Sequence, residues 1–200
     1  MSIPGLLFAA SVFAQDATDS TFESVVAQLA EYGVVRGNYS QTREIELLSR
    51  PLVSGGSFVL SDLGLYWQQD RPFKSVLIAD GERLVQSIDD GPITSIDAAE
   101  HPMVLPFSRI FLSIFNGSEQ QLREHFTISF DVQDGRWAIG LKPASYPLSE
   151  AIDTINLGGR EYIESLTVIS RSSDVMTITF TDHQTQPDHL TEHEIELYSR

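Results

Sequence analysis

The chain has 200 residues, of which 13 are Lys or Arg and 28 are Asp or Glu, so its formal net charge is −15. Such an acidic protein would repel phosphate backbones and anionic membrane surfaces, and we therefore expect no nucleic-acid binding and no attachment to a membrane by charge. The chain has no cysteine, which excludes disulfides, thiolate catalysis and a lipid anchor on an N-terminal cysteine. Hydrophobic residues make up 42% of the chain, enough for a packed core.

The first segment is a short apolar run, residues 3–14, followed by polar residues. Val12 and Ala14 stand where a secretory signal peptide has small residues before its cleavage site, although the usual basic residues at the start are missing. The run is shorter than the about 20 apolar residues that cross a bilayer, so we expect no stable membrane insertion. We predict a signal peptide over residues 1–14 and one exported domain over residues 15–200. The alternative is that the run is a strand or helix of the fold itself.

The next segment is predicted to be an amphipathic helix over residues 22–33, because its apolar residues recur every three to four positions. Ser20 and Glu23 have the spacing of a capping box at its start. From residue 34 to about residue 102, short apolar stretches alternate with Gly, Asp and Pro. This punctuation predicts an antiparallel meander of strands.

A second amphipathic helix is predicted over residues 104–116, followed by a short helical turn that ends at His125. The apolar residues of residues 104–116 have the spacing of a wide helical stripe. They are Phe107, Ile110, Phe111, Ile114 and Phe115.

The rest of the chain is predicted to return to antiparallel strands, because short apolar stretches again alternate with turn residues. The expected strands cover residues 126–132, 136–143, 152–157, 161–170, 175–181 and 194–198. The stretch between the last two is predicted to be a hairpin loop. Together these elements predict a mainly β fold, a large antiparallel sheet with two helical insertions.

The densest polar cluster of the sequence lies in that predicted loop. His183, His189 and His193, with the carboxylates beside them, could hold a transition metal, but charged residues in a hairpin loop are more often simply hydrated. An enzyme would need an acid–base pair, for which Asp182, His183, Asp188 and His189 are the candidates. The sequence contains no nucleotide-binding loop, nucleophile elbow or zinc-protease helix, and we expect neither catalysis nor a cofactor.

The two predicted helices would cover one apolar face of the sheet, and this arrangement allows two interpretations. Either the helices close a solid core, or the helices and a curved sheet enclose a cavity for an apolar ligand. Periodicity alone fits both.

Several short motifs, in their order along the chain, resemble the periplasmic outer-membrane lipoprotein carriers of the LolA-like family. They are Tyr39-Ser40-Gln41, Gly56-x-Phe58, Leu65-Tyr66-Trp67, Pro72, Ile78-Ala79-Asp80-Gly81-x-x-Leu84 and the strand from Trp137 to Pro143. The resemblance implies an incompletely closed antiparallel β-barrel, or curved sheet, covered by a helical lid. It also implies an apolar cavity that carries the acyl chains of a lipoprotein or lipid through the periplasm, from an inner-membrane exporter to an outer-membrane acceptor. The lipid-anchored acceptor of similar fold requires a cysteine, and this chain has none, so we expect the soluble shuttle type. We also expect a monomer.

The resemblance places the cavity wall and the lid on apolar residues of both halves of the chain. They are Tyr39, Phe58, Leu60, Leu65, Trp67, Phe107, Ile110, Phe111, Ile114, Phe115, Trp137 and Ile139. Two features depart from the family: Tyr66 stands where the carriers have an Arg that is tied to lid closure and cargo release, and the chain is strongly acidic. We therefore expect a divergent member. The alternative function is a non-catalytic interaction module of the cell envelope, with a solid core and an acidic partner-binding surface.

Overall fold

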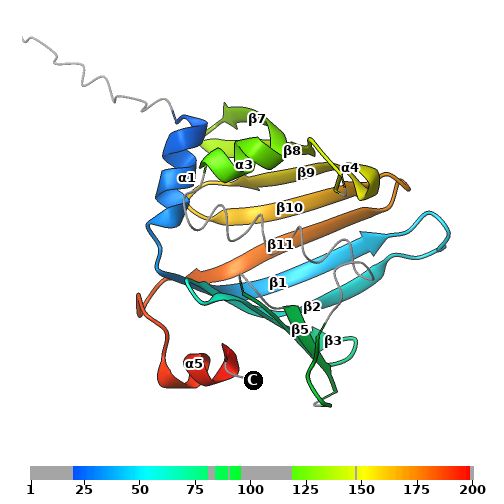
Figure 1. The fold of residues 1–200 in the computed structure, drawn as a ribbon, viewed down its shortest axis with the longest axis vertical. Helices are drawn as coiled ribbons and strands as arrows, with labels where there is room; N and C mark the ends of the chain where they lie inside the picture. Colours follow the sequence, from blue (N-terminus) through cyan, green and yellow to red (C-terminus); the bar gives the residue numbers. More distant parts are fainter. Residues whose placement is uncertain (1–19, 81–83, 90, 96–118, 147, 199–200) are drawn as a thin grey trace, which may run out of the picture.

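A computed structural model describes residues 20–80, 84–89, 91–95, 119–146 and 148–198 (Figure 1). Strands dominate these residues, and short helices lie around them. No helix in this part of the chain is long and apolar enough to cross a bilayer. The predicted signal peptide and the predicted helix over residues 104–116 lie outside the described residues.

The elements of the first half of the chain are one helix and six strands. They are α1 (Phe22–Ala30), β1 (Val34–Glu44), β2 (Leu52–Ser61), β3 (Gly64–Arg71), β4 (Ser75–Ala79), β5 (Leu84–Ile88) and β6 (Thr94–Ser95). The second half supplies three short helices and five strands. They are α3 (Glu119–His125), β7 (Phe126–Gln133), β8 (Arg136–Pro143), α4 (Leu148–Ala151), β9 (Ile152–Gly159), β10 (Ile163–Ser170), β11 (Val175–Gln184) and α5 (Glu192–Tyr198).

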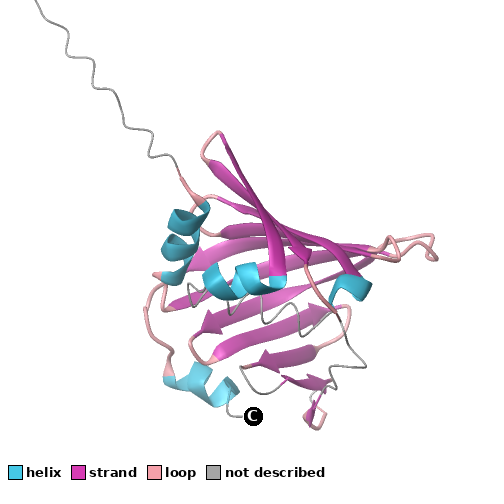
Figure 2. Ribbon diagram, turned by 45° about the horizontal axis from the view of Figure 1, so that its top comes forward, coloured by secondary structure: helices cyan, strands magenta, loops and turns pink. Residues whose placement is uncertain are grey.

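The eleven described strands form one antiparallel sheet in the order β6-β5-β4-β3-β2-β1-β11-β10-β9-β8-β7. The first and last parts of the meander meet where β1 pairs with β11. In this pairing Tyr39 lies directly opposite Phe180. The sheet is curved but does not close, because β6 and β7 remain its two edges (Figure 2). The predicted fold class, a mainly β protein with an incompletely closed antiparallel sheet and short helices, is confirmed.

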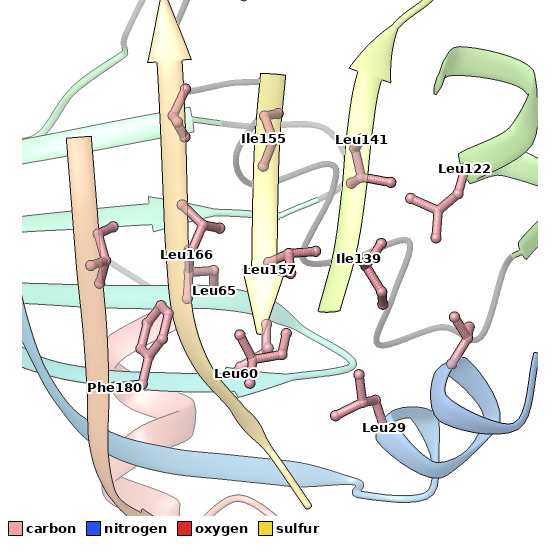
Figure 3. Close-up of a cluster of buried hydrophobic side chains, with 14 of the residues drawn as sticks. Leu29, Leu60, Leu65, Leu122, Ile139, Leu141, Ile155, Leu157, Leu166 and Phe180 are labelled. Atoms are coloured by element: carbon pink, nitrogen blue, oxygen red, sulfur yellow. The ribbon is translucent and has the colours of Figure 1, made fainter. Parts of the chain in front are cut away.

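The side chains of alternate residues define two faces of this sheet. The inner face carries Leu60, Leu65 and Ile139, which belong to the main buried cluster together with residues of α1 and α3. Figure 3 shows side chains of β2, β3 and β8–β10 pointing into this shared interior, with Leu29 and Leu122 beside them. The outer face carries a smaller cluster of Tyr66, Ile78, Val85 and Tyr198, so α5 packs on the opposite side of the sheet from α1. Side chains alternate across a strand, and one strand can therefore serve both clusters.

Helix α1 begins at Phe22, as the sequence pattern predicts, but its capping box starts one residue later than expected. Its capping box is formed by Thr21 and Ser24, not by Ser20 and Glu23: the Ser24 N–H donates to Thr21 Oγ1 at 3.2 Å, and the Thr21 N–H donates to Ser24 Oγ at 2.9 Å. A hydroxyl at the third helical position replaces the usual carboxylate. The helix ends at Ala30, before the predicted end at Gly33.

The predicted strand over residues 194–198 is wrong, because this segment is the helix α5. The helix starts with a capping box: the Thr191 N–H donates to Glu194 Oε2 at 2.8 Å, and the Glu194 N–H donates to Thr191 Oγ1 at 3.3 Å. The Thr-x-x-Glu spacing is visible in the sequence and is the signal that would have identified this helix.

Candidate functional site

Seven of the predicted cavity residues lie in one hydrophobic cluster on the inner face. They are Tyr39, Phe58, Leu60, Leu65, Trp67, Trp137 and Ile139. The five residues predicted on the helix over residues 104–116, Phe107, Ile110, Phe111, Ile114 and Phe115, lie outside the described residues.

The register of β2 and β3 brings the first of these residues together. Phe58 pairs with Trp67 and Leu60 pairs with Leu65, so four apolar side chains face the interior from two adjacent strands. On the other side of β3, Trp67 pairs with Leu77 of β4. Cross-strand apolar and aromatic neighbours of this kind stabilise a sheet, and they also make its surface apolar over three strands.

Four aromatic rings form the centre of this surface, and we call Tyr39, Phe58, Trp67 and Phe180 the aromatic cluster. The ring centroids of Tyr39 and Trp67 are 3.8 Å apart, those of Phe58 and Phe180 5.3 Å, and those of Trp67 and Phe180 6.1 Å. Tyr39 pairs with Gly56 of β2, and its ring reaches past β2 to Trp67 on β3. Tyr39, Phe58 and Phe180 are buried, whereas Trp67 and its neighbour Leu77 are only partly buried.

Helices α1 and α3 lie beside the other half of the inner face. Phe22 of α1 packs edge-on against Phe130 of β7, with 6.2 Å between the ring centroids. The Arg123 guanidinium of α3 lies 5.2 Å from the centre of the Phe22 ring. Gln28 Nε2 donates to the carbonyl of Glu161, in the turn between β9 and β10, at 3.1 Å. These contacts place α1 and α3 against the β7–β10 half of the sheet.

Trp137 is held by a specific hydrogen bond. Its Nε1–H donates to the carbonyl oxygen of Arg160 at 2.7 Å, and its side chain is 4% exposed. A Cβ added at Gly159 would lie 2.7 Å from the indole ring, so the glycine leaves room for it. The indole therefore ties β8 to the turn between β9 and β10, which is a structural role.

Histidine 183 extends the aromatic surface. Its ring stacks on Tyr162 with centroids 4.8 Å apart and meets the Phe58 ring edge-on at 6.3 Å. His183 Nε2 lies 3.0 Å from the carbonyl oxygen of Ile163, which assigns the ring hydrogen to Nε2. Partial burial of the ring lowers the pKa of His183 below its ordinary value, because the charged form would lose hydration.

The three histidines proposed as metal ligands do not form a metal site in the part of the chain that the structure describes. His189 is exposed beside Asp188, His193 lines a cavity on the outer face, and His183 packs among aromatic rings. The described residues contain no group of three or more His, Cys, Asp or Glu side chains that could hold a metal ion. The loop alternative, in which these charged groups are simply hydrated, fits His189 and Asp188 best.

Sequence reasoning did not find a cavity of about 490 Å³ on the outer face, between α5 and strands β3–β5. Tyr66, Val76, Ile78, Val85 and Leu197 are among its lining residues. Tyr66, which the motif resemblance sets against an Arg of the carriers, lies on the outer face, and its hydroxyl donates to Gln68 Oε1 at 3.1 Å. Its ring lies under α5, with the Tyr66 and Tyr198 ring centroids 6.2 Å apart.

The chain was compared with known families, curated proteins and solved structures. No family model matches the sequence, and the search of the curated proteins found no match. A LolA-superfamily protein from Nitrosomonas europaea is similar in structure, with a TM-score of 0.49 and 7% identity over 87% of this chain and 96% of that one. A DUF1329 family protein from Desulfovibrio piger has a TM-score of 0.47 and 8% identity over 85% and 92% of the two chains.

An outer membrane lipoprotein-sorting protein domain from Vibrio parahaemolyticus has a TM-score of 0.44 and 9% identity over 88% of this chain and 97% of that one. All three TM-scores lie below 0.5, and all three identities lie below 10%.

Proposed function

We propose that this protein is a carrier that binds the acyl chains of a lipoprotein or lipid against the inner face of its sheet. The observation that carries this proposal is that Trp67 of the aromatic cluster, and Leu77 next to it on β4, stay partly exposed beside three buried rings. A filled core has no need of such a surface, whereas an apolar ligand needs a broad apolar wall that it can reach.

Burial of hydrocarbon supplies the affinity in this proposal. Each CH₂ group removed from water contributes about 0.8 kcal/mol, so a long acyl chain is held through apolar contact alone. The site needs no acid, base or metal, which agrees with the absence of catalytic motifs in the sequence. The open edges of the sheet, β6 and β7, allow the two halves to adjust to a ligand of variable length.

The cellular role follows as part of the same proposal. The protein would be a periplasmic monomer that receives its cargo from an inner-membrane exporter and delivers it to an outer-membrane acceptor. Phe107, Ile110, Phe111, Ile114 and Phe115 remain the predicted lid residues on the strength of the sequence pattern.

A charge placed on the exposed part of the apolar wall tests the proposal. Leu77→Asp should abolish binding of a fluorescent fatty-acyl probe, because an aspartate carboxylate beside Trp67 would have to lose its hydration when the probe binds. Probe fluorescence in a titration measures the affinity, and circular dichroism verifies that the β-rich spectrum is retained.

The matched control is Leu47→Asp, which makes the same change in the turn after β1, where the side chain is 93% exposed. It should bind the probe as the unchanged protein does. Native mass spectrometry of the protein purified from cells should also reveal bound lipid. Undiminished probe binding by Leu77→Asp would reject this face as the site, and a lipid-free protein that binds no probe would favour the alternative of an envelope interaction module.

A further inference from the structure

Two hydroxyl groups on the inner face are buried without a hydrogen-bond partner. They are Tyr39 Oη and Ser54 Oγ, and no other side-chain nitrogen or oxygen of the described residues has this property. Tyr39 as a whole is 4% exposed. Buried polar groups in folded proteins are nearly always paired, because an unpaired one loses its hydration without compensation. Two such groups on one face therefore require an explanation.

The strand register places both residues on the inner face of neighbouring strands. Tyr39 pairs with Gly56, and two residues earlier on β2, Ser54 pairs with Gln41. Residues two apart on a strand point the same way, so Ser54 shares its face with Gly56 and Phe58. Tyr39 and Ser54 are diagonal neighbours across β1 and β2, a relation in which the residues are about 7–8 Å apart.

Tyr198 gives a reference for a tyrosine that has only a structural role. It is 5% exposed, about as buried as Tyr39, but its hydroxyl donates to the carbonyl oxygen of Val59 at 2.8 Å. The same fold therefore gives the buried hydroxyl of Tyr198 a hydrogen-bond acceptor and gives none to the hydroxyl of Tyr39, which lies on the face that carries the aromatic cluster.

From this juxtaposition we infer that Tyr39 and Ser54 form a polar contact for the carbonyl group of an ester- or amide-linked acyl chain whose hydrocarbon part lies on the aromatic cluster. This inference rests on the proposed function and names its substrate class: acyl esters and amides in preference to plain hydrocarbon. Each hydroxyl can donate one hydrogen to a carbonyl oxygen, which has two lone pairs to accept them.

The chemistry of the contact fits a neutral ligand group. Burial raises the pKa of Tyr39 above its ordinary value, the polar contact with the Trp67 indole lowers it by less, and the charge of Asp70 raises it further, so the phenol stays protonated at neutral pH. The indole N–H can only donate, so the phenol hydrogen of Tyr39 remains without an acceptor. The hydroxyl of Ser54 is uncharged as well. A free carboxylate would lose more hydration on this apolar face than an ester or amide carbonyl, which loses little and gains the hydrogen bonds.

Three probes of equal chain length test the inference. Each carries pyrene at one end, and the other end is a methyl ester, an N-methyl amide or a plain alkyl terminus. The unchanged protein should bind the ester and the amide about tenfold more tightly than the hydrocarbon, the gain expected of one buried hydrogen bond. The ester and amide arms distinguish glycerolipid-like from amide-linked acyl groups.

Tyr39→Phe should weaken binding of the ester and the amide, because one of the two donors is lost, and the hydrocarbon should bind as before. Because the Tyr39 hydroxyl has no partner in the free protein, the variant should melt at the same temperature as the unchanged protein or higher. Ser54→Ala should weaken ester binding in the same direction. The matched control Tyr198→Phe should do the reverse, with a lower melting temperature and an unchanged preference for the ester.

The outcomes separate the inference from the proposed function. Equal affinity of the unchanged protein for ester, amide and hydrocarbon overturns the inference and leaves the carrier proposal standing. An ester preference that is undiminished in Tyr39→Phe, or a clear loss of thermal stability in that variant, also overturns it. If none of the three probes binds, both fail.

Discussion

At the residue scale, the strongest polar contact of the outer face joins Arg36 of β1 to Glu194 of α5. Arg36 Nε lies 2.5 Å from Glu194 Oε1, and Nη2 lies 2.8 Å from Oε2, so the pair is bidentate. The guanidinium also donates to the carbonyl oxygens of Pro187 and His189, each at 2.9 Å. The hydrogen bonds from Arg36 lower the pKa of Glu194 from 4.5 to about 2. One arginine thus holds both α5 and the segment that leads to it.

This pair makes the stability of the protein depend on pH. Because the pKa of Glu194 is lower in the folded protein, its contribution is fully present above pH 4.5 and is lost as the pH falls towards 2. We expect Glu194→Gln to lower the free energy of unfolding by about 2 kcal/mol at pH 7. The difference between the variant and the unchanged protein should shrink towards zero near pH 2.

Denaturant unfolding of both proteins at pH 7, 4 and 2 measures this difference. Glu196→Gln is the control, since it makes the same change on the same helix outside the contact with Arg36. A difference for Glu194→Gln that stays constant across the range would show that the ion pair is not its source.

At the element scale, the residue pattern predicted the hairpins but not the last helix, whose capping signal alternation hides. Asp134 and Gly135 form the turn between β7 and β8 with φ of 51° and 70°, the left-handed conformation that an Asp-Gly pair favours. The segment Glu194–Tyr198 has the alternation of a strand in its residue types, yet it folds as a helix. Its capping box, and the packing of Tyr198 in the outer cluster, outweigh that alternation because they are tertiary and terminal contacts that periodicity does not count.

Alanine substitutions at two glycines, Gly56 and Gly135, test how closely adjacent strands of the sheet approach each other. A Cβ at Gly56 would lie 1.9 Å from the backbone oxygen of Gln68, so Gly56→Ala must push β2 and β3 apart at the aromatic cluster. We expect a loss of about 3 kcal/mol in the free energy of unfolding. At Gly135 the nearest atom to an added Cβ is the Arg160 Nη1 at 3.8 Å, and only the positive φ opposes a side chain.

Gly135→Ala is therefore the matched comparison, with an expected loss of about 1 kcal/mol. Urea unfolding of the two variants measures both losses. Equal losses would mean that β2 and β3 are not in close contact at Gly56.

At the scale of the whole molecule, the residue pattern predicted a large antiparallel sheet with an apolar face, and the family resemblance added its curvature. Alternation places Phe58, Leu60, Leu65 and Trp67 on one side, and the structure confirms that they share one cluster. Alternation could not reveal that Trp67 stays partly exposed or that Tyr39 Oη lacks a hydrogen-bond partner. Both depend on which residues of distant strands the curvature of the sheet brings close to these side chains. The outer cavity was missed for the same reason, since α5 reaches β3–β5 only through the fold.

A ligand that binds the folded protein alone stabilises the whole molecule. At a free ligand concentration of 100 times its dissociation constant the gain is about 2.7 kcal/mol. For a chain of this length such a gain raises the melting temperature by roughly 5–11 °C. We therefore expect a soluble fatty-acyl ester to shift the unfolding transition by that amount, with a dependence on ligand concentration that follows the binding curve. Differential scanning calorimetry measures the shift.

Leu77→Asp should lose this shift in melting temperature and Leu47→Asp should keep it, because only the first variant places a carboxylate beside Trp67. A melting temperature that does not move at concentrations where the probe is displaced would show that the ester binds the unfolded chain as well as the folded one, and would contradict a site that only the fold creates.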